Sequence, residues 1–425
     1  MRFLIPLMLM LSTALDAAER EVLDKRILEL SADELPTAAG VASERLSVAV
    51  WDGDGFNPVP FQIDEIGEAD LVWFPASGLE REGRAGRFDG KDRLLLLFAD
   101  AGLEAPEQAQ PEEGELLARI ALDDAGQQAR VFYLLLDNAQ RSEQRYVRHD
   151  VERGVTETEG YTLRVDPDNE LNWRHLDYKT YQGEGSIIDT LKMRMSAGLL
   201  YRGARITLDN DNLRPELIGF KEGPIRSVMH LETRVVFGGI SMMRLQVQAH
   251  RYPWHYEAHT YARIPALYKT TLRAPEVAVS IDGNAQYGAV VRTARGGDLE
   301  GLIDGRIDDE EKRLIKRGLS TDESWILFDS QRGFTMLTRL DVPPELSGIP
   351  LGLLYQDDAH KEVGPEQFPG QLPNIGYVLN DWPPERELRF AVSLLFDSAL
   401  GDIEPGRYAD LRLSRPAITV TPLNQ

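Results

Sequence analysis

The sequence predicts a mainly β protein: a small N-terminal β-sandwich followed by a larger, supersandwich-like antiparallel β-sandwich, with one short helix near residues 308–317. Two observations predict this class. Short runs of β-branched and aromatic residues alternate with clusters of Gly, Pro, Asn and Asp, which is typical of strands joined by tight turns. The connections between the longest runs are short, for example Gly238-Gly239 and Pro265, which favours antiparallel meanders over crossover connections.

The first part of the chain contains runs that we expect to be strands, at residues 45–51, 116–122 and 131–136. The segment 52–55, Asp-Gly-Asp-Gly, predicts a turn because glycine adopts positive φ and aspartate accepts hydrogen bonds from its own backbone. The polar stretch 138–159 has no apolar period, so we place a domain boundary there. We therefore expect an N-terminal β domain over 19–150 and a larger antiparallel sandwich over 151–425.

The larger domain is expected to contain long strands in series, at 225–237, 242–250, 254–263, 268–279, 388–396 and 407–413. One helix is expected over 310–317, capped by Asp308 or Asp309 and ended by Gly318. Its acidic residues come first and its basic residues last, which matches the helix dipole.

Residues 1–18 have the order of a secretory signal peptide: one positive charge, an apolar run over 3–11, then small residues. Cleavage after Ala14 and cleavage near 17–18 both fit this order. A buried N-terminal helix is the alternative, which Pro6 disfavours. No later stretch has the roughly 20 apolar residues of a membrane-spanning helix. We therefore expect an exported, periplasmic protein with no transmembrane segment in its mature chain.

The chain has 69 Asp and Glu against 47 Lys and Arg, a formal net charge of −22, and no cysteine. This charge argues against nucleic acid as a partner, because such binding draws on clustered positive charge. Without cysteine there are no disulfides, thiolate metal ligands or cysteine nucleophile. Walker, dinucleotide-binding, His-Glu-x-x-His and Gly-x-Ser-x-Gly motifs are also absent, which argues against nucleotide-driven, zincin and α/β-hydrolase chemistry.

The most suggestive pattern for chemistry is the segment 254–261, Trp-His-Tyr-Glu-Ala-His-Thr-Tyr. In a strand, side chains two apart share a face, so His255, Glu257 and His259 would line one side. Two imidazoles and a carboxylate can bind a divalent metal or supply an acid and a base to a substrate. Further polar residues join this group if the strands pair as neighbours: His230, Glu232 and His250.

Three interpretations of this segment stay open. A solvated sheet face can carry the polar residues while Trp254 and Tyr256 pack inward. A metal site would use His255, Glu257 and His259 as ligands. A catalytic face would use acids and bases drawn from His230, His255, Tyr256, Glu257 and His259. Nearby residues would suit a groove that stacks on sugar rings and holds acidic groups, although such rings are also common in strands: Arg251, Trp254, Tyr261 and Arg263.

Two acidic stretches carry oxygen ligands of the kind that calcium prefers. The first, 88–92, is also an Asp-Gly turn with a lysine inside it. The second, 300–311, matches only the second half of an EF-hand loop, because Leu302 stands where an oxygen ligand is needed. A helix cap already explains Asp308. In both stretches we prefer the turn or cap, and the identity of any bound metal stays open.

Two stretches carry a resemblance to known proteins. Residues 59–65 (VPFQIDE), followed by 88–92 (FDGKD), resemble the N-terminal region of large exported bacterial proteins of unassigned function. Residues 221–226 (KEGPIR), leading into long antiparallel strands, resemble the β supersandwich of galactose-mutarotase-like proteins and several polysaccharide lyases. The second resemblance implies a sheet that binds carbohydrate, with His, Glu, Tyr or Arg as acid and base.

These observations lead to two functional hypotheses. In the first, the chain is a periplasmic carbohydrate-binding or carbohydrate-active protein, such as a lyase or epimerase, that holds a glycan in a groove of the larger domain. In the second, it is a non-catalytic envelope accessory protein that binds a hydrophobic ligand, a metal or a protein partner, since no specific catalytic motif is present. Whether the chain is an enzyme stays open.

Overall fold

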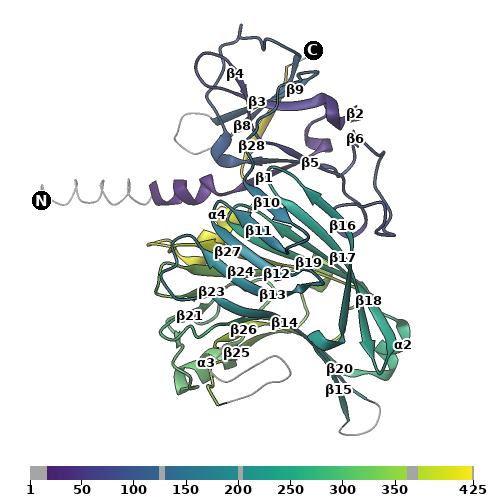
Figure 1. Ribbon diagram of the computed structural model, residues 1–425, viewed down its shortest axis with the longest axis vertical. Coiled ribbons are helices and arrows are strands. Elements are labelled where there is room, and N and C mark those ends of the chain that lie inside the picture. The colour runs from purple at the N-terminus through teal and green to yellow at the C-terminus, as the bar shows by residue number, and fades with distance from the viewer. Residues whose placement is uncertain (1–16, 124–129, 200–203, 361–371, 424–425) are drawn as a thin grey trace, which may run out of the picture. The chain divides into compact units, whose positions relative to one another are not determined.

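The computed structural model describes residues 17–123, 130–199, 204–360 and 372–423 (Figure 1). The chain forms two compact units. Unit 1 comprises Met1–Arg148, Lys221–Ser227 and Gly401–Gln425, and unit 2 comprises His149–Phe220 and Val228–Leu400. The C-terminal segment, expected in the larger domain, lies in unit 1, where strand β28 (Ile418–Pro422) pairs with β8 (Glu115–Leu122).

Unit 1 contains a small sandwich. Its five-stranded sheet has the order β28-β8-β9-β3-β4, with β9 at Arg130–Leu136, β3 at Leu46–Trp51 and β4 at Phe56–Pro58. Its three-stranded sheet has the order β1-β7-β5, at Ile27–Ser31, Arg93–Leu97 and Gln62–Asp64. A two-stranded sheet joins β2 (Val41–Ala42) to β6 (Arg87–Phe88). Alternate apolar residues of the two larger sheets form one core, including Leu30, Val48, Leu94 and Phe132.

Unit 2 contains a larger antiparallel sandwich. Its main sheet has nine strands in the order β16-β17-β18-β19-β27-β24-β23-β21-β22. These strands span Leu213–Glu222, Ser227–Phe237, Ile240–Arg251, His255–Arg263, Glu387–Asp397, Thr335–Asp341, Ile326–Asp329, Val290–Thr293 and Gly301–Leu302. A five-stranded sheet has the order β15-β14-β20-β26-β25, at Arg205–Leu208, Ile188–Gly198, Arg273–Gly283, Asn374–Asn380 and Leu351–Gln356. Apolar side chains of both sheets share one core.

A four-stranded antiparallel sheet adds to this core. It consists of β10 (Val147–Asp150), β11 (Val155–Thr158), β12 (Tyr161–Asp166) and β13 (Asn169–Tyr178). Apolar residues of β12 and β13, such as Leu163, Trp173 and Leu176, are buried in the core of unit 2. The chain is therefore mainly β, as the sequence predicts.

The predicted helix near 308–317 is confirmed as α3 (Asp309–Arg317). The Asp308 carboxylate accepts hydrogen bonds from the backbone N–H groups of Glu310 and Glu311, and Glu311 Oε2 accepts one from Asp308 N–H. Gly318 ends the helix with φ of 59°, a conformation that glycine adopts without a Cβ penalty. The Asp308 side chain is thus a helix cap, as preferred for this stretch.

Two predicted strands were partly or wholly wrong. The strand expected over 268–279 starts only at Arg273, because helix α2 (Ala266–Thr271) follows Pro265. The run expected to be a strand over 407–413 is helix α4 (Pro405–Leu413). The Glu404 side chain caps it by accepting a hydrogen bond from Arg407 N–H, and Pro405 stands in its first turn. A short apolar run is compatible with the period of a helix and with that of a strand. The cap at Glu404 favours the helix here.

The predicted signal peptide, residues 1–18, lies almost entirely outside the described residues, and residues 17–24 are helical. Among the described residues, no helix combines the length and the apolar character needed to cross a membrane.

Candidate functional site

Strands β17, β18 and β19 present one polar side of the nine-stranded sheet, which we call the histidine face. On the opposite side, Val247, Tyr256, Ala258 and Thr260 line the sheet-to-sheet core together with Ile281 of the other sheet. Because side chains alternate along a strand, the intervening residues point the other way. The histidine face consists of His230, Gln246, Gln248, His250, His255, Glu257, His259 and Tyr261.

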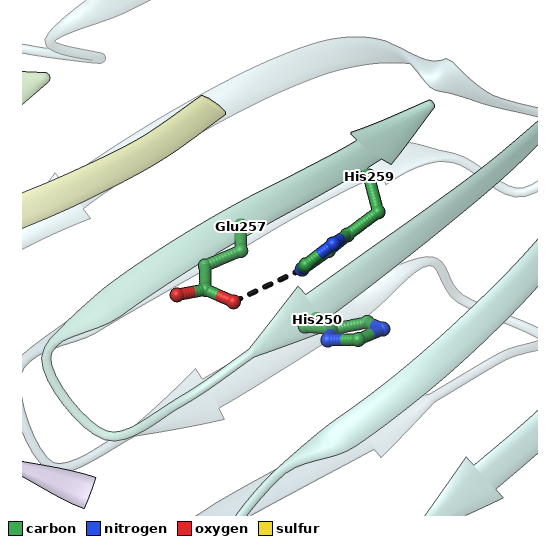
Figure 2. Close-up of side chains that lie close together, drawn as sticks. All are labelled: His250, Glu257 and His259. Atoms are coloured by element: carbon green, nitrogen blue, oxygen red, sulfur yellow. Dashed lines mark hydrogen bonds and ion pairs between the residues drawn. The ribbon is translucent and has the colours of Figure 1, made fainter. Parts of the chain in front are cut away.

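Three of these side chains form the centre of the face (Figure 2). One potential ligand atom from each of His250, Glu257 and His259 lies within 4.8 Å of the others. His259 Nε2 is 3.0 Å from Glu257 Oε2, and the rings of His250 and His259 have centroids 4.3 Å apart. The cross-strand register explains the grouping, because His250 of β18 lies directly opposite Glu257 of β19.

A chain of buried hydrogen bonds leads to His250 from the neighbouring strand. Gln246 Oε1 lies 2.8 Å from His230 Nε2, Gln248 Nε2 lies 3.1 Å from His230 Nδ1, and Gln248 Oε1 lies 3.0 Å from His250 Nε2. Burial lowers the pKa of His230, against the opposing effects of Gln246 and Glu232, so the ring is neutral at neutral pH. With the amides oriented in this way, neutral His250 carries its proton on Nε2 and a lone pair on Nδ1.

The Glu257 carboxylate is surrounded by further polar groups. Tyr252 Oη lies 3.5 Å from Oε2, Ser393 Oγ lies 3.5 Å from Oε1, and His255 Nε2 lies 3.8 Å from Oε1. The His255 ring stacks on Tyr252, with centroids 4.0 Å apart and planes 11° apart. Glu257 and His259 keep side-chain exposures of 17% and 27%, so a solvent molecule or ligand can reach them.

Residues 255–261 are extended, as their alternation predicts, whereas Trp254 precedes the strand, and β19 brings together most of the predicted site residues. His255, Glu257 and His259 share one side of β19, and His230 joins the same network through Gln248. The predicted metal trio differs from the observed group. His255 Nε2 lies 3.8 Å from Glu257 Oε1, whereas His259 Nε2 lies 3.0 Å from Oε2, and the clustered ligand atoms come from His250, Glu257 and His259.

Two predicted site residues point away from this face. Tyr256 is buried in the core, with its ring edge-on to Trp173 at a centroid distance of 4.7 Å. Burial raises its pKa to about 12, so the phenol keeps its proton at neutral pH and does not serve as a base. Arg251 is also buried and forms an ion pair with Glu170, with 2.9 Å between Nη2 and Oε2.

The remaining predicted binding residues have other local roles. Trp254 stands in the turn between β18 and β19 and packs against Gly160, where a Cβ atom would come within 2.7 Å of the indole. Tyr261 is buried on the histidine face, and its hydroxyl accepts a hydrogen bond from Arg263 Nε at 2.9 Å. Arg263 is exposed beside it, so among these residues Arg263 is the part of the predicted sugar groove that a ligand can reach.

Sequence reasoning missed Gln246, Gln248 and Ser393. The two glutamines share the alternation of His250 within β18, and that pattern could have revealed them. Ser393 could not have been found in this way. It faces Glu257 because β27 pairs with β19 across more than a hundred residues of sequence.

In the two acidic stretches, aspartate carboxylates accept hydrogen bonds from nearby backbone N–H groups or pair with an arginine. Asp92 accepts from the N–H groups of Ile66 and Asp89, and Asp89 pairs with Arg84. In the second stretch, Asp308 caps α3. Among the described residues, the group of three His, Asp or Glu side chains with clustered ligand atoms is His250, Glu257 and His259. Neither acidic stretch contributes to such a group.

Unit 2 also contains an apolar cavity of about 260 Å³ between its two large sheets, near α2. Leu199 and Phe237 among its lining residues are 36% and 46% exposed, which places apolar surface at its rim. Its other lining residues are mainly aliphatic, sulfur-containing and aromatic, including Met195, Leu208, Val235, Met243, Leu245, Tyr268, Trp382 and Phe390.

No family model and no curated protein sequence matches the chain. Among solved structures, it is similar to an α-mannosidase from Enterococcus faecalis V583, with a TM-score of 0.50, 10% sequence identity, and coverage of 94% of this chain and 43% of the mannosidase. It is also similar to the α-N-acetylgalactosaminidase NagBb from Bifidobacterium bifidum, with a TM-score of 0.36, 11% identity, and coverage of 58% of this chain and 36% of that one. The chain thus spans less than half the length of either, and at such identity the first likeness shows a shared β fold alone.

Proposed function

We propose that this chain is a carbohydrate-binding protein that holds a glycan over the histidine face, with Glu257 and His259 as a proton-transfer pair. One observation carries the proposal: His259 Nε2 and Glu257 Oε2 are 3.0 Å apart, partly exposed, and surrounded by the polar groups of three adjacent strands. Side chains on central strands of a sheet are held rigidly, which suits recognition of a ligand with many hydroxyl groups.

The chemistry of the pair suits proton transfer at a sugar. A carboxylate beside an imidazole orients the ring and stabilises its protonated form. In the catalytic form of the proposal, His259 removes a proton from a sugar carbon next to a carboxylate with the ring nitrogen that does not face Glu257, and Glu257 stabilises the imidazolium that results. The electron pair left on that carbon forms a double bond as the glycosidic C–O bond at the next carbon breaks, and the departing oxygen takes a proton from water. Arg263 lies about 13 Å farther along the same side of β19, where it would contact the carboxylate of a neighbouring uronic-acid residue.

The resemblance to the β supersandwich of polysaccharide lyases supports the same ligand class, and the apolar run near the N-terminus supports export to the periplasm, where glycans are available. The fold likeness to an α-mannosidase is compatible with this proposal and does not identify a substrate.

The experiment is a binding and turnover screen of the purified chain against uronic-acid polymers and neutral glycans, read by calorimetry and by formation of unsaturated product. We expect Glu257→Gln and His259→Gln to reduce affinity or turnover at least tenfold. His360→Gln changes an exposed histidine outside the face and serves as the matched control. Absence of binding and of product with every polymer would refute the proposal.

A second candidate function rests on the apolar cavity, whose volume of about 260 Å³ exceeds the roughly 150 Å³ that is enough to take up benzene. In this version the chain binds a hydrophobic ligand, such as part of an acyl chain, without catalysis. Titration with a fluorescent fatty acid tests it. Ala197→Leu places a larger side chain in the cavity and should abolish uptake, whereas Ala139→Leu on the exposed surface should not.

A further inference from the structure

We infer that His250, Glu257 and His259 form a binding site for one divalent transition-metal ion of the zinc type. This inference concerns the free protein and does not depend on the glycan proposal. It rests on three features of the group: the separation of the ligand atoms, the partners that hold them, and the chemistry of the donor set.

The separation of the donor atoms suits a shared ion. A tetrahedral zinc ion with bonds of about 2.0–2.1 Å holds its ligand atoms roughly 3.3 Å apart. His259 Nε2 and Glu257 Oε2 are already 3.0 Å apart, and the ligand atom of His250 lies within 4.8 Å of both. His250 and Glu257 stand at directly opposed positions on β18 and β19, and His259 lies two residues from Glu257 on the same side of β19, so a small side-chain rotation completes the group.

The partners of His250 resemble those of a metal ligand. A metal-bound histidine usually donates its second ring N–H to a carboxylate or carbonyl oxygen, which orients the ring and its lone pair. His250 Nε2 makes this contact with Gln248 Oε1, and the buried His230 fixes the Gln248 amide from its other side. The hydroxyl groups of Tyr252 and Ser393 lie on the two oxygens of Glu257 and orient the carboxylate in the same way.

The donor set selects the class of metal. Two imidazoles and one carboxylate suit Zn²⁺, Co²⁺, Ni²⁺ or Cu²⁺, whereas Ca²⁺ and Mg²⁺ prefer oxygen ligands throughout. Three protein ligands leave at least one coordination position for water or an exogenous ligand. The partial exposure of Glu257 and His259 places that position within reach of solvent.

The test uses the full purified chain with any affinity tag removed, freed of metal by a chelator and then desalted. Zn²⁺ is titrated by calorimetry and by competition with a chromogenic chelator, and Co²⁺ is followed by its visible absorption. We expect one ion per chain, with a wild-type Co²⁺ spectrum of nitrogen and oxygen ligation. His250→Ala, Glu257→Gln and His259→Gln should each weaken Zn²⁺ binding at least 100-fold, and Gln248→Leu should weaken it 10- to 100-fold.

The control His360→Gln should bind Zn²⁺ as the wild type does, and circular dichroism checks that each variant is folded. Absence of stoichiometric Zn²⁺ binding by the wild type overturns the inference, as does equal binding by the wild type and a folded His250→Ala/His259→Gln double variant. If a variant fails to fold, X-ray absorption of the Zn²⁺-loaded wild type decides: a first shell without two imidazoles contradicts the site. Glycan binding by the metal-free protein would support the proposed function even if Zn²⁺ does not bind, so the two proposals can fail separately.

Discussion

Arg226 and Asp64 form a fully buried ion pair within unit 1. Arg226 Nη2 and Nε lie 2.7 and 2.8 Å from Asp64 Oδ2, and the side chains are 2% and 0% exposed. Lys221 Nζ lies 2.7 Å from Asp64 Oδ1, and Gln62 Oε1 accepts a hydrogen bond from Arg226 N–H. The stretches 59–65 and 221–226, in which the sequence resembles known proteins, therefore bind each other.

Asp64→Asn should strongly destabilise the protein, because it leaves the Arg226 guanidinium buried beside a neutral partner. Loss of one member of a buried pair costs about 3–5 kcal/mol. Urea unfolding measures the change, with Asp137→Asn as the control, since Asp137 forms a surface pair with Arg45. A change no larger than that of the control would contradict the structural role of the pair.

The same pair predicts a response to acid. Burial alone would raise the pKa of Asp64, but Arg226 and Lys221 outweigh it and hold the pKa below its usual value. The stabilisation is therefore complete above about pH 4 and is lost as the pH falls through the folded-state pKa. The difference in unfolding free energy between the wild type and Asp64→Asn should shrink below pH 4.

His149 should make unit 2 sensitive to mild acid. Its side chain is buried against Thr156, and burial, with a smaller effect of Arg251, lowers its pKa to about 3. Because the folded-state pKa is below the unfolded value of about 6.5, stability is lost as the pH falls below 6.5. The loss attributable to His149 is roughly 2 kcal/mol by pH 5. Denaturant unfolding of His149→Gln should show a flatter pH dependence, whereas His360→Gln should keep the wild-type slope.

Asp100 should destabilise unit 1 at neutral pH. Burial raises its pKa to about 6, although the Tyr146 hydroxyl donates a hydrogen bond to Oδ1 at 2.5 Å and opposes the shift. A raised carboxyl pKa favours folding below the unfolded value of about 3.9, and that contribution is lost as the pH rises through 6. Asp100→Asn keeps the acceptor for Tyr146 and should raise the free energy of unfolding by about 1–3 kcal/mol at pH 8. Equal gains at pH 8 and pH 4 would point to a cause other than titration.

Tyr256 lies on the core side of β19, opposite the histidine face. Tyr256→Ala should cost about 3–5 kcal/mol, because it removes a buried ring that packs edge-on against Trp173. Tyr256→Phe keeps the ring and should leave both glycan and Zn²⁺ affinity within twofold of the wild type. A tenfold loss of either affinity in Tyr256→Phe, measured by calorimetry, would show that the Tyr256 hydroxyl takes part in binding.

Local pattern was enough to predict the mainly β class, the capped helix near 308–317, and the extended conformation of 255–261 with His255, Glu257 and His259 on one side. Each of these depends on neighbours within a few residues: a cap within one turn, or the alternation of side chains along a strand. The same local signals failed at 407–413, where a run of similar composition is a helix because Glu404 caps it.

Only the tertiary structure decided which side chains meet. It placed His250 rather than His255 beside His259, brought Ser393 to Glu257, and turned Tyr256 and Arg251 away from the site. Alternation divides the residues of a strand between two sides, but it determines neither which side is covered nor which strand lies alongside. Those choices follow from pairing between segments such as β19 and β27, far apart in sequence, and from burial of the apolar side against a second sheet.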